Sequence, residues 1–315
     1  MTGTGAEDLT ALAAAIGRGH KGALAGALAR LESDPDGERV LALLDAAWRA
    51  PRAEVIGLTG PPGVGKSTLT GALITALRGQ GRTVAVIAVD PSSRRSGGAL
   101  LGDRVRLATD PEDTGVFVRS MAARDRLGGL AGLTVAAMVL MRALYDVVLV
   151  ETVGVGQSET DVVSAVDTVV FCVQPGSGDS LQFMKAGIVE IPHIIAVTKA
   201  DMGAAATRAR TDVAGALGLA EDETGWRIPV LALSALQREG ITALVEALTA
   251  RARFLSEAGR LVRQRHRQAE AWLADEIRDR WGREGLKRAG PLTLPQDEPP
   301  FGRLKEVVAR LRGWC

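Results

Sequence analysis

A turn of nine residues, Gly60-Pro-Pro-Gly-Val-Gly-Lys-Ser-Thr68, constrains the fold of this 315-residue chain more than any other feature. It follows an apolar run at 55–59 and precedes a stretch whose apolar residues recur at helical spacing. Backbone N–H groups in such a strand–turn–helix unit surround phosphate oxygens at the positive end of the helix. The composition of the chain gives only about 0.01 chance matches to the pattern. The predicted phosphate-binding residues are Gly60, Pro61, Pro62, Gly63, Val64, Gly65, Lys66, Ser67 and Thr68.

Two side chains of this loop have predicted chemical roles. Lys66 should reach the β- and γ-phosphates of a nucleoside triphosphate, and the Ser67 hydroxyl should ligate Mg²⁺. The chain contains 6 lysines against 32 arginines, and a forked guanidinium is too bulky for the loop. The sequence therefore predicts a nucleotide site that uses Mg²⁺.

Short apolar runs alternate with helical stretches through the middle of the chain. The runs lie at 55–59, 83–89, 116–119, 146–150, 168–173, 194–198 and 228–233. This alternation is typical of an α/β fold, with a mostly parallel central sheet that helices cover on both faces. We predict a P-loop domain at 51–250, an N-terminal helical extension at 1–50 and a C-terminal helical arm at 251–315.

The segment Thr198-Lys-Ala-Asp201 follows one of these runs and predicts the choice of base. A carboxylate at Asp201 accepts from both N1–H and N2–H₂ of guanine, whereas adenine presents an acceptor at N1 and leaves the charge unpaired. The Lys199 stem should cover the base, and GTP or GDP is the predicted ligand. Thr198 stands where Asn is usual, so a side-chain link to the phosphate loop is not predicted. The predicted guanine-binding residues are Thr198, Lys199, Asp201, Ser234, Ala235 and Leu236.

Acidic residues that end two of the apolar runs are candidates for the metal site. Glu151 follows the run at 146–150, where a carboxylate holds Mg²⁺ through water, and the Gly154 N–H is placed to bond the γ-phosphate. Asp90 begins a polar, glycine-bearing loop that reaches Asp103 and is suited to ordering when triphosphate binds.

Composition excludes several classes of function. Lys+Arg 38 against Asp+Glu 37 leaves a net charge of +1, so no global field favours nucleic acid or an acidic membrane. The apolar stretch at 127–141 is too short to span a bilayer, and Glu7 lies where a signal peptide would be basic. Two cysteines and three scattered histidines form no ligand set, and Cys172 is expected in the core. We expect a cytoplasmic protein that binds neither nucleic acid nor membrane.

Several further runs, in order along the chain, carry a specific resemblance. They are Val89-Asp-Pro-Ser-Ser93, Ser96-Gly-Gly98, Leu101-Gly-Asp103, Val150-Glu-Thr-Val-Gly-Val-Gly-Gln-Ser-Glu159 and Pro175-Gly-Ser-Gly-Asp-Ser-Leu-Gln182. Together they resemble the MeaB/ArgK family, which belongs to the SIMIBI class of P-loop GTPases. Its members are chaperones of adenosylcobalamin-dependent acyl-CoA mutases of the methylmalonyl-CoA mutase type. The resemblance is dense over about 55–236 and loose at the helical ends.

This resemblance implies an activity and further site residues. The implied activity is Mg²⁺-dependent GTP hydrolysis that gates cofactor loading of the mutase and protects it. The resemblance implies that three carboxylates serve Mg²⁺ and the attacking water, namely Asp90, Asp103 and Glu151. Together with Lys66 they form the predicted catalytic set. A mobile segment would sense the mutase through Pro175, Gly176, Ser177, Gly178, Asp179, Gln182 and Lys185. No arginine finger is assigned among the arginines.

A homodimer is predicted on two grounds. Members of the family are typically homodimers built partly through their C-terminal helices. In addition, two apolar stripes lie outside the predicted sheet domain, and an isolated helix cannot bury such faces alone. We therefore expect the arm to pair with a second copy in a two-fold dimer. The stripes are Trp272, Ile277 and Trp281, and Phe301, Leu304 and Val308.

Two other classes of function are open alternatives. One is an ATPase or kinase that serves basic amino-acid transport, but the chain lacks the L-S-G-G-Q signature of transport ATPases and the kinase signatures. The other is a metal-insertion GTPase, which would be expected to carry clustered Cys and His ligands. The partner mutase could act on methylmalonyl-CoA, isobutyryl-CoA, ethylmalonyl-CoA or hydroxyisobutyryl-CoA.

Overall fold

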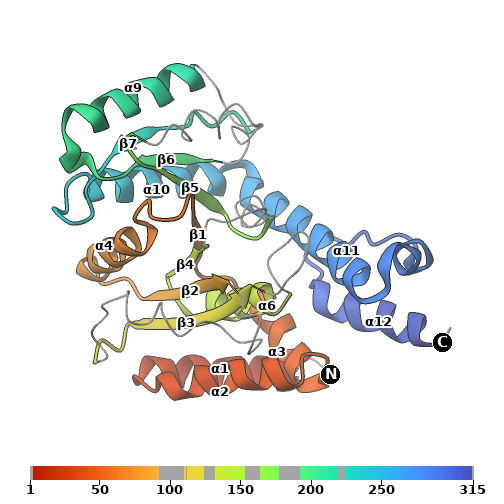
Figure 1. Cartoon of the computed structure of the whole chain (residues 1–315). Coiled ribbons are helices and arrows are strands. Elements are labelled where there is room, and N and C mark those ends of the chain that lie inside the picture. The colour runs from red at the N-terminus through yellow and green to blue at the C-terminus, as the bar shows by residue number, and fades with distance from the viewer. Residues whose placement is uncertain are drawn as a thin grey trace.

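A seven-stranded parallel sheet forms the centre of the described structure (Figure 1). The computed structural model describes residues 3–91, 110, 112–123, 132–152, 164–176, 192–218 and 224–313, with only the backbone at 90, 91, 122 and 123. The strands are β1 (Glu54–Thr59), β2 (Val84–Pro91), β3 (Val116–Ala123), β4 (Val147–Glu151), β5 (Thr168–Val173), β6 (Ile194–Val197) and β7 (Val230–Ala232). Their order is β3-β2-β4-β1-β5-β6-β7. The predicted α/β fold with a parallel sheet is confirmed.

Helices cover both faces of this sheet and extend it at both ends of the chain. The sheet-covering helices are α4 (Lys66–Gly79), α6 (Gly132–Leu144), α9 (Ala204–Leu217) and α10 (Ile241–Ser256). The N-terminal helices are α1 (Gly3–Gly17), α2 (Lys21–Ser33) and α3 (Glu38–Arg49), and the C-terminal ones are α11 (Arg260–Ala289) and α12 (Pro300–Arg312). Two short 3₁₀ turns are η3 (Ala200–Met202) and η4 (Glu257–Gly259).

The strand sequences are apolar on both faces because both faces are buried. Successive side chains of a strand point to opposite sides. In β1, Val55 belongs to the core cluster formed with α6 and the N-terminal helices, whereas Ile56 and Leu58 belong to the cluster formed with α4 and α10. On the other half of the sheet, α9 covers Phe171 of β5. A strand in this position needs a continuous apolar run, and the sequence provides one.

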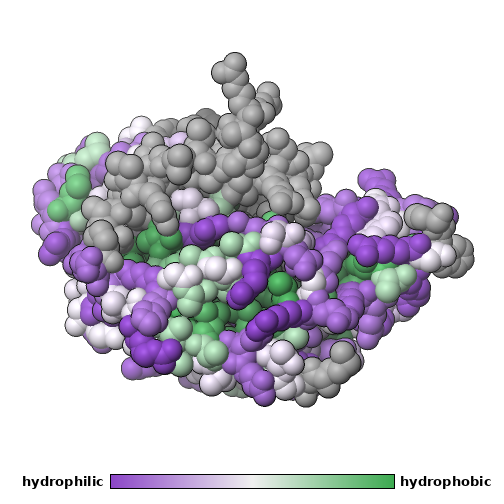
Figure 2. All heavy atoms as spheres, turned by 90° about the horizontal axis from the view of Figure 1, so that it is seen from below, coloured by the Kyte–Doolittle hydropathy of each residue, from purple (hydrophilic) through white to green (hydrophobic). Residues whose placement is uncertain are grey.

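The C-terminal helices pack against each other and against the N-terminal extension. Trp272 of α11 lies 5.0 Å from Phe301 of α12 between ring centroids, and Trp48 of α3 lies 6.5 Å from Phe301. Ile277 and Leu304 are buried in the cluster that joins α11 to α12. The expectation that these stripes need a second copy to cover them is therefore wrong, because the chain covers them itself. Seen from below, the arm on the right presents mainly hydrophilic residues (Figure 2).

A buried ion pair fastens α11 to the sheet domain. Arg265 donates from Nε to Asp167 Oδ1 at 2.8 Å and from Nη2 to Asp167 Oδ2 at 2.6 Å. Arg265 Nη2 also donates to the Ala53 carbonyl at 2.9 Å, and Asp167 Oδ2 accepts from the Val55 N–H at 2.8 Å. Ala53 and Asp167 precede β1 and β5 directly. The arm is thus attached at the amino ends of the central strands.

Among the described residues, no helix combines enough length with enough apolar character to cross a bilayer.

Candidate functional site

The predicted phosphate loop forms the turn between β1 and α4. Gly60 has φ 132°, and a Cβ at this position would lie 2.3 Å from the carbonyl oxygen of Cys172 on β5. Gly65 has φ 99° and directly precedes α4. Only glycine adopts both conformations without strain. The loop is therefore held close to the sheet, with the N-terminus of α4 at the end of the central strand β1.

Lys66 is buried at the start of α4 and is folded back onto the loop. Its Nζ donates to the carbonyl oxygens of Gly60 at 2.6 Å and Pro61 at 2.9 Å. These two carbonyls belong to the loop that is predicted to surround the phosphates. The lysine is thus held within the predicted site, with its charge at the phosphate loop.

Glu151 and Ser67 meet at the carboxyl end of the sheet, as the metal-site prediction requires. Glu151 ends β4, which pairs with β1, and its carboxylate is buried. Oε1 accepts from the Ser67 hydroxyl at 2.5 Å, and Oε2 accepts from the Thr70 hydroxyl at 2.8 Å. A hydroxyl and a carboxylate are oxygen donors of the kind that Mg²⁺ prefers. The donor set therefore fits a magnesium site shared by the phosphate loop and β4.

Sequence reasoning missed two hydroxyl residues next to this pair. Thr70 lies one helical turn after Lys66. The i, i+4 spacing could therefore have predicted that both residues lie on the same face of α4. Thr152 donates to the Thr59 hydroxyl at 3.1 Å and so joins the ends of β4 and β1. The Thr70 hydroxyl contacts Glu151 directly, whereas Thr152 joins the two strand ends beside it.

Thr198 links the predicted base-reading loop to the phosphate loop, although the sequence did not predict this link. Its hydroxyl donates to the Val64 carbonyl at 2.7 Å, and the Val173 carbonyl lies 3.0 Å away as an alternative acceptor. Thr198 is buried, so the contact is protected from water. A threonine hydroxyl thus supplies a connection that was expected only from an asparagine amide.

Lys199 adds a second link between the same two loops. It has a φ of 55°, and its Nζ donates to the Gly63 carbonyl at 3.1 Å and to Gln174 Oε1 at 2.5 Å. Gln174, which follows β5, was not among the predicted site residues. The stem of Lys199 therefore lies over the phosphate loop.

Asp201 lies in the 3₁₀ turn η3, and its side chain is exposed. The loop around it is joined to the predicted loop after β7, because the Ala200 N–H donates to the Leu233 carbonyl at 3.0 Å. Ser234 is buried there, whereas Leu236 is 80% exposed. The structure thus brings the two predicted guanine-binding segments, including Ala235, side by side.

Other predicted site residues are only partly placed. The backbone of Asp90 lies near the carboxyl end of β2, two residues beyond Ala88, which pairs with Glu151. Pro175 and Gly176 form a turn directly after β5. The remaining predicted positions lie outside the described residues, namely Asp103, Gly154, Ser177, Gly178, Asp179, Gln182 and Lys185.

Cys172 and His193 have structural positions. Burial raises the pKa of the Cys172 thiol to about 12, so this residue is a core residue, as predicted. His193 Nδ1 accepts from the Val169 N–H at 2.9 Å. Within the described part of the chain, no three His, Cys, Asp or Glu side chains are grouped as metal ligands. These residues thus give no support to the metal-insertion alternative.

Comparisons with known proteins show which family this chain resembles. The chain matches the family model described as "Methylmalonyl Co-A mutase-associated GTPase MeaB" over residues 24–286. A Pyrococcus abyssi protein named as a GTPase is 47% identical over 223 residues, covering 69% of this chain and 68% of that protein. The mouse "Methylmalonic aciduria type A homolog, mitochondrial" is 37% identical over 228 residues, covering 71% of this chain and 55% of the mouse protein.

A solved structure resembles the whole chain. The crystal structure described as "LAO/AO transport system kinase" has a TM-score of 0.66 and 29% identity, and the match covers 96% of this chain and 97% of the other.

Proposed function

This chain belongs to the family of methylmalonyl-CoA mutase-associated GTPases, and we propose that it is a G-protein chaperone of an adenosylcobalamin-dependent acyl-CoA mutase. As a member of that family it binds guanine nucleotides and hydrolyses GTP. In the proposal, hydrolysis gates the loading of the mutase with its cofactor and protects the loaded enzyme. The name of the family and that of the mouse relative support a mutase as the partner.

The observation that carries the nucleotide part of the proposal is the double link between the two loops. Thr198 and Lys199 bond to carbonyls of the phosphate loop, at 2.7 Å and 3.1 Å. A loop fixed in this way presents the Asp201 carboxylate at a set position relative to the phosphates. Because a buried polar mismatch is costly, a fixed carboxylate would select guanine over adenine.

The phosphate side of the site would supply charge to the reaction. We propose that Ser67 and Glu151 hold Mg²⁺, which would neutralise charge that develops on the transferred phosphoryl group. Lys66 would leave the carbonyls of Gly60 and Pro61 and bind phosphate oxygens instead. Thr70 would keep the Glu151 carboxylate oriented through its hydrogen bond. Asp90 and Asp103 would complete the set around the attacking water.

The segment from Pro175 to Lys185 is proposed to transmit the state of the nucleotide to the mutase. It begins directly after β5, at the carboxyl edge of the sheet where the phosphate loop also lies. In parallel α/β sheets this edge carries the ligand. If the segment couples the partner to the site, Lys185→Ala keeps intrinsic hydrolysis within a few-fold and loses most of the stimulation by the mutase. Unchanged stimulation would assign the coupling to the loop between Asp90 and Asp103 instead.

A homodimer remains part of the proposal, on the basis of the family resemblance alone. The described apolar stripes of the arm give it no support, because they are covered within one chain.

The proposed division of the chain into three parts also remains. Helix α10 packs on the sheet, so the arm begins after α10 as a packing unit.

The experiment that tests the proposed function measures GTP turnover of the full chain with and without a purified mutase. Each of the four acyl-CoA mutase types is added in turn, and ATP replaces GTP in a parallel series. We expect one mutase to raise GTP turnover, and no comparable turnover of ATP. Lys66→Ala is the control, which should be inactive with and without the mutase. Equal use of ATP, or transfer of phosphate to a protein, would favour the kinase named in the related structure.

A further inference from the structure

A cavity of about 680 Å³ lies at the amino end of the central strands, away from the phosphate loop. Arg52, Ala53 and Glu54 line it at the start of β1, whereas the phosphate loop follows the end of the same strand. Pockets that bind small molecules in proteins usually measure about 300–1,000 Å³. The cavity is thus of a suitable size for a ligand, and it is separate from the nucleotide site.

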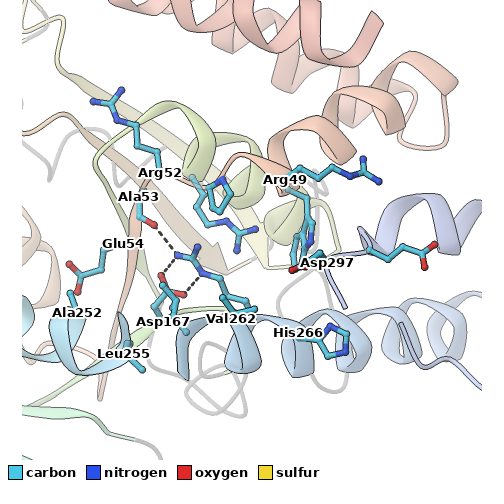
Figure 3. Close-up of a pocket in the computed structure, with 16 residues that line it drawn as sticks. Arg49, Arg52, Ala53, Glu54, Asp167, Ala252, Leu255, Val262, His266 and Asp297 are labelled. Carbon is cyan, nitrogen blue, oxygen red and sulfur yellow. Dashed lines mark hydrogen bonds and ion pairs between the residues drawn. The ribbon is translucent and has the colours of Figure 1, made fainter. Parts of the chain in front are cut away.

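Three parts of the chain form the walls of this cavity (Figure 3). The N-terminal extension contributes Trp48, and the sheet domain contributes Arg142 at the end of α6. Helices α10 and α11 provide an apolar side formed by Leu255, Leu261 and Val262. A ligand in this space would therefore touch the extension, the sheet domain and the arm together.

Arg142 is the distinctive group of this cavity. Its side chain is only 2% exposed, yet its Nε is buried and makes no hydrogen bond within the part of the chain that the structure describes. The Trp48 ring lies against the guanidinium, 4.7 Å from Cζ to the ring centroid. A ring on the face of a guanidinium leaves its in-plane N–H donors available. The neighbouring Arg265 differs, because Asp167 and the Ala53 carbonyl occupy its donors.

A buried cation whose Nε has no acceptor among the described residues is unfavourable, and this cost indicates what would bind. Burial, together with the charge of Arg265, lowers the pKa of Arg142 to about 9, so the group still carries its charge at neutral pH. Buried charges in proteins are normally paired and hydrogen-bonded. An anionic group that enters the cavity would provide both the counter-charge and the acceptors.

We propose that this cavity binds a small organic anion, whose acidic group accepts from Arg142 and whose apolar body packs on Leu255, Leu261 and Val262. A carboxylate and a phosphate share the required chemistry. The size of the cavity and its apolar side favour an anion with a ring or a short hydrocarbon body over an inorganic ion. The nucleotide should not compete, because it binds at the opposite end of β1.

The test uses the fluorescent probe 8-anilinonaphthalene-1-sulfonate, an anion with an apolar body. It is titrated into the full chain in saturating GDP, so that the nucleotide site is filled. We expect one probe per chain and displacement by 1-naphthoate or 1-naphthyl phosphate. The more effective competitor distinguishes a carboxylate ligand from a phosphate ligand. The neutral analogue N-phenyl-1-naphthylamine should bind about tenfold more weakly, since it lacks the charge-assisted hydrogen bond.

Two variants assign the binding to the cavity. Arg142→Met should weaken binding of the anionic probe by about tenfold and leave the neutral analogue almost unchanged. The fold should persist, because an apolar side chain of similar size is tolerated in place of a buried charge that has no hydrogen-bonded counter-ion among the described residues. Val262→Asp, at a position that is 50% exposed, adds a negative charge at the apolar side and should also weaken the probe. Arg278→Met removes an exposed arginine of α11 outside the cavity and serves as the matched control.

Three outcomes would overturn the proposal. The first is equal affinity of the anionic probe for the unaltered chain and Arg142→Met. The second is much weaker binding of the probe in saturating GDP than in the absence of nucleotide, which would place the probe in the nucleotide site. The third is the absence of a single saturable site on the full chain, which includes the case of a second copy filling the cavity.

Discussion

At the residue scale, Thr198 connects the two predicted nucleotide-binding loops through one hydroxyl. Thr198→Val keeps the shape of the side chain but leaves the Val64 and Val173 carbonyls without this donor. An unpaired buried polar group costs about 1–3 kcal/mol. We expect the base-reading loop to lose its fixed position, and GDP affinity measured by calorimetry to fall by about tenfold.

The matched control for this prediction is Thr198→Ser, which retains the hydroxyl. Its GDP affinity should stay close to that of the unaltered chain. If Thr198→Val also binds GDP normally, the contact with Val64 does not organise the site.

Glu54 gives the stability of the protein a pH dependence. Burial raises the pKa of its carboxyl from 4.5 to about 7; Arg82 and Arg265 oppose this rise, and Asp167 adds to it. The folded chain therefore retains the Glu54 proton at a pH where the unfolded chain has lost it. The free energy of unfolding should fall as pH rises from about 4.5 to about 7, by roughly 3 kcal/mol in total.

Chemical denaturation of Glu54→Gln at several pH values checks this dependence. The variant lacks the ionisation and should gain stability relative to the unaltered chain between pH 5 and pH 8. Burial also raises the pKa of Asp45, to about 6, so the prediction concerns the difference between the two proteins. A difference that does not change with pH would contradict it.

At the scale of secondary-structure elements, the pair of Arg265 and Asp167 holds α11 on the sheet. Asp167 has a side chain only 3% exposed, so Arg265→Met leaves a buried carboxylate without its main partner. Removal of one member of a buried pair costs about 3–5 kcal/mol. We expect urea denaturation to show a loss of this size.

The control for this pair is Arg278→Met on the same helix. Arg278 pairs with Asp275, and both side chains are exposed. Such a pair contributes about 0–1 kcal/mol. Similar losses in both variants would mean that the ion pair does not anchor the arm.

The sequence predicted the strands well and the packing of the arm poorly, for a physical reason. A strand buried on both faces needs a continuous apolar run, and each predicted run contains or overlaps a strand of the sheet. The stripe on α11 also shows that it needs a covering surface. However, that surface comes from Trp48 and Phe301, which are far apart in sequence, and a local pattern does not distinguish them from a second copy.

The difference between local patterns and contacts that are distant in sequence also applies to the candidate site. The phosphate loop and Glu151 were predictable because glycines and a strand end fix their positions. The link from Thr198 to Val64 was not, since it depends on how closely two loops approach each other, and the usual asparagine at this position was an incomplete guide. Gln174 gave no signal, because a single glutamine after a strand has no pattern.

At the scale of the whole molecule, the two ends of the central strands have different roles in this account. The carboxyl ends carry the nucleotide loops, and the amino ends carry the arm and the anion cavity. β1 connects them directly, from Glu54 at the cavity to Thr59 before the phosphate loop. The partner mutase would meet the nucleotide end through the segment after β5.

The most direct test of the central claim is the rate at which apo-mutase takes up adenosylcobalamin in the presence of this chain, followed by cobalamin absorbance. The rate is compared with GTP, with a non-hydrolysable GTP analogue and with the Lys66→Ala variant. The account predicts that loading with GTP differs clearly from loading under the two conditions without hydrolysis, which should resemble each other. The same loading rate under all three conditions would contradict the claim that GTP hydrolysis by this protein gates cofactor loading.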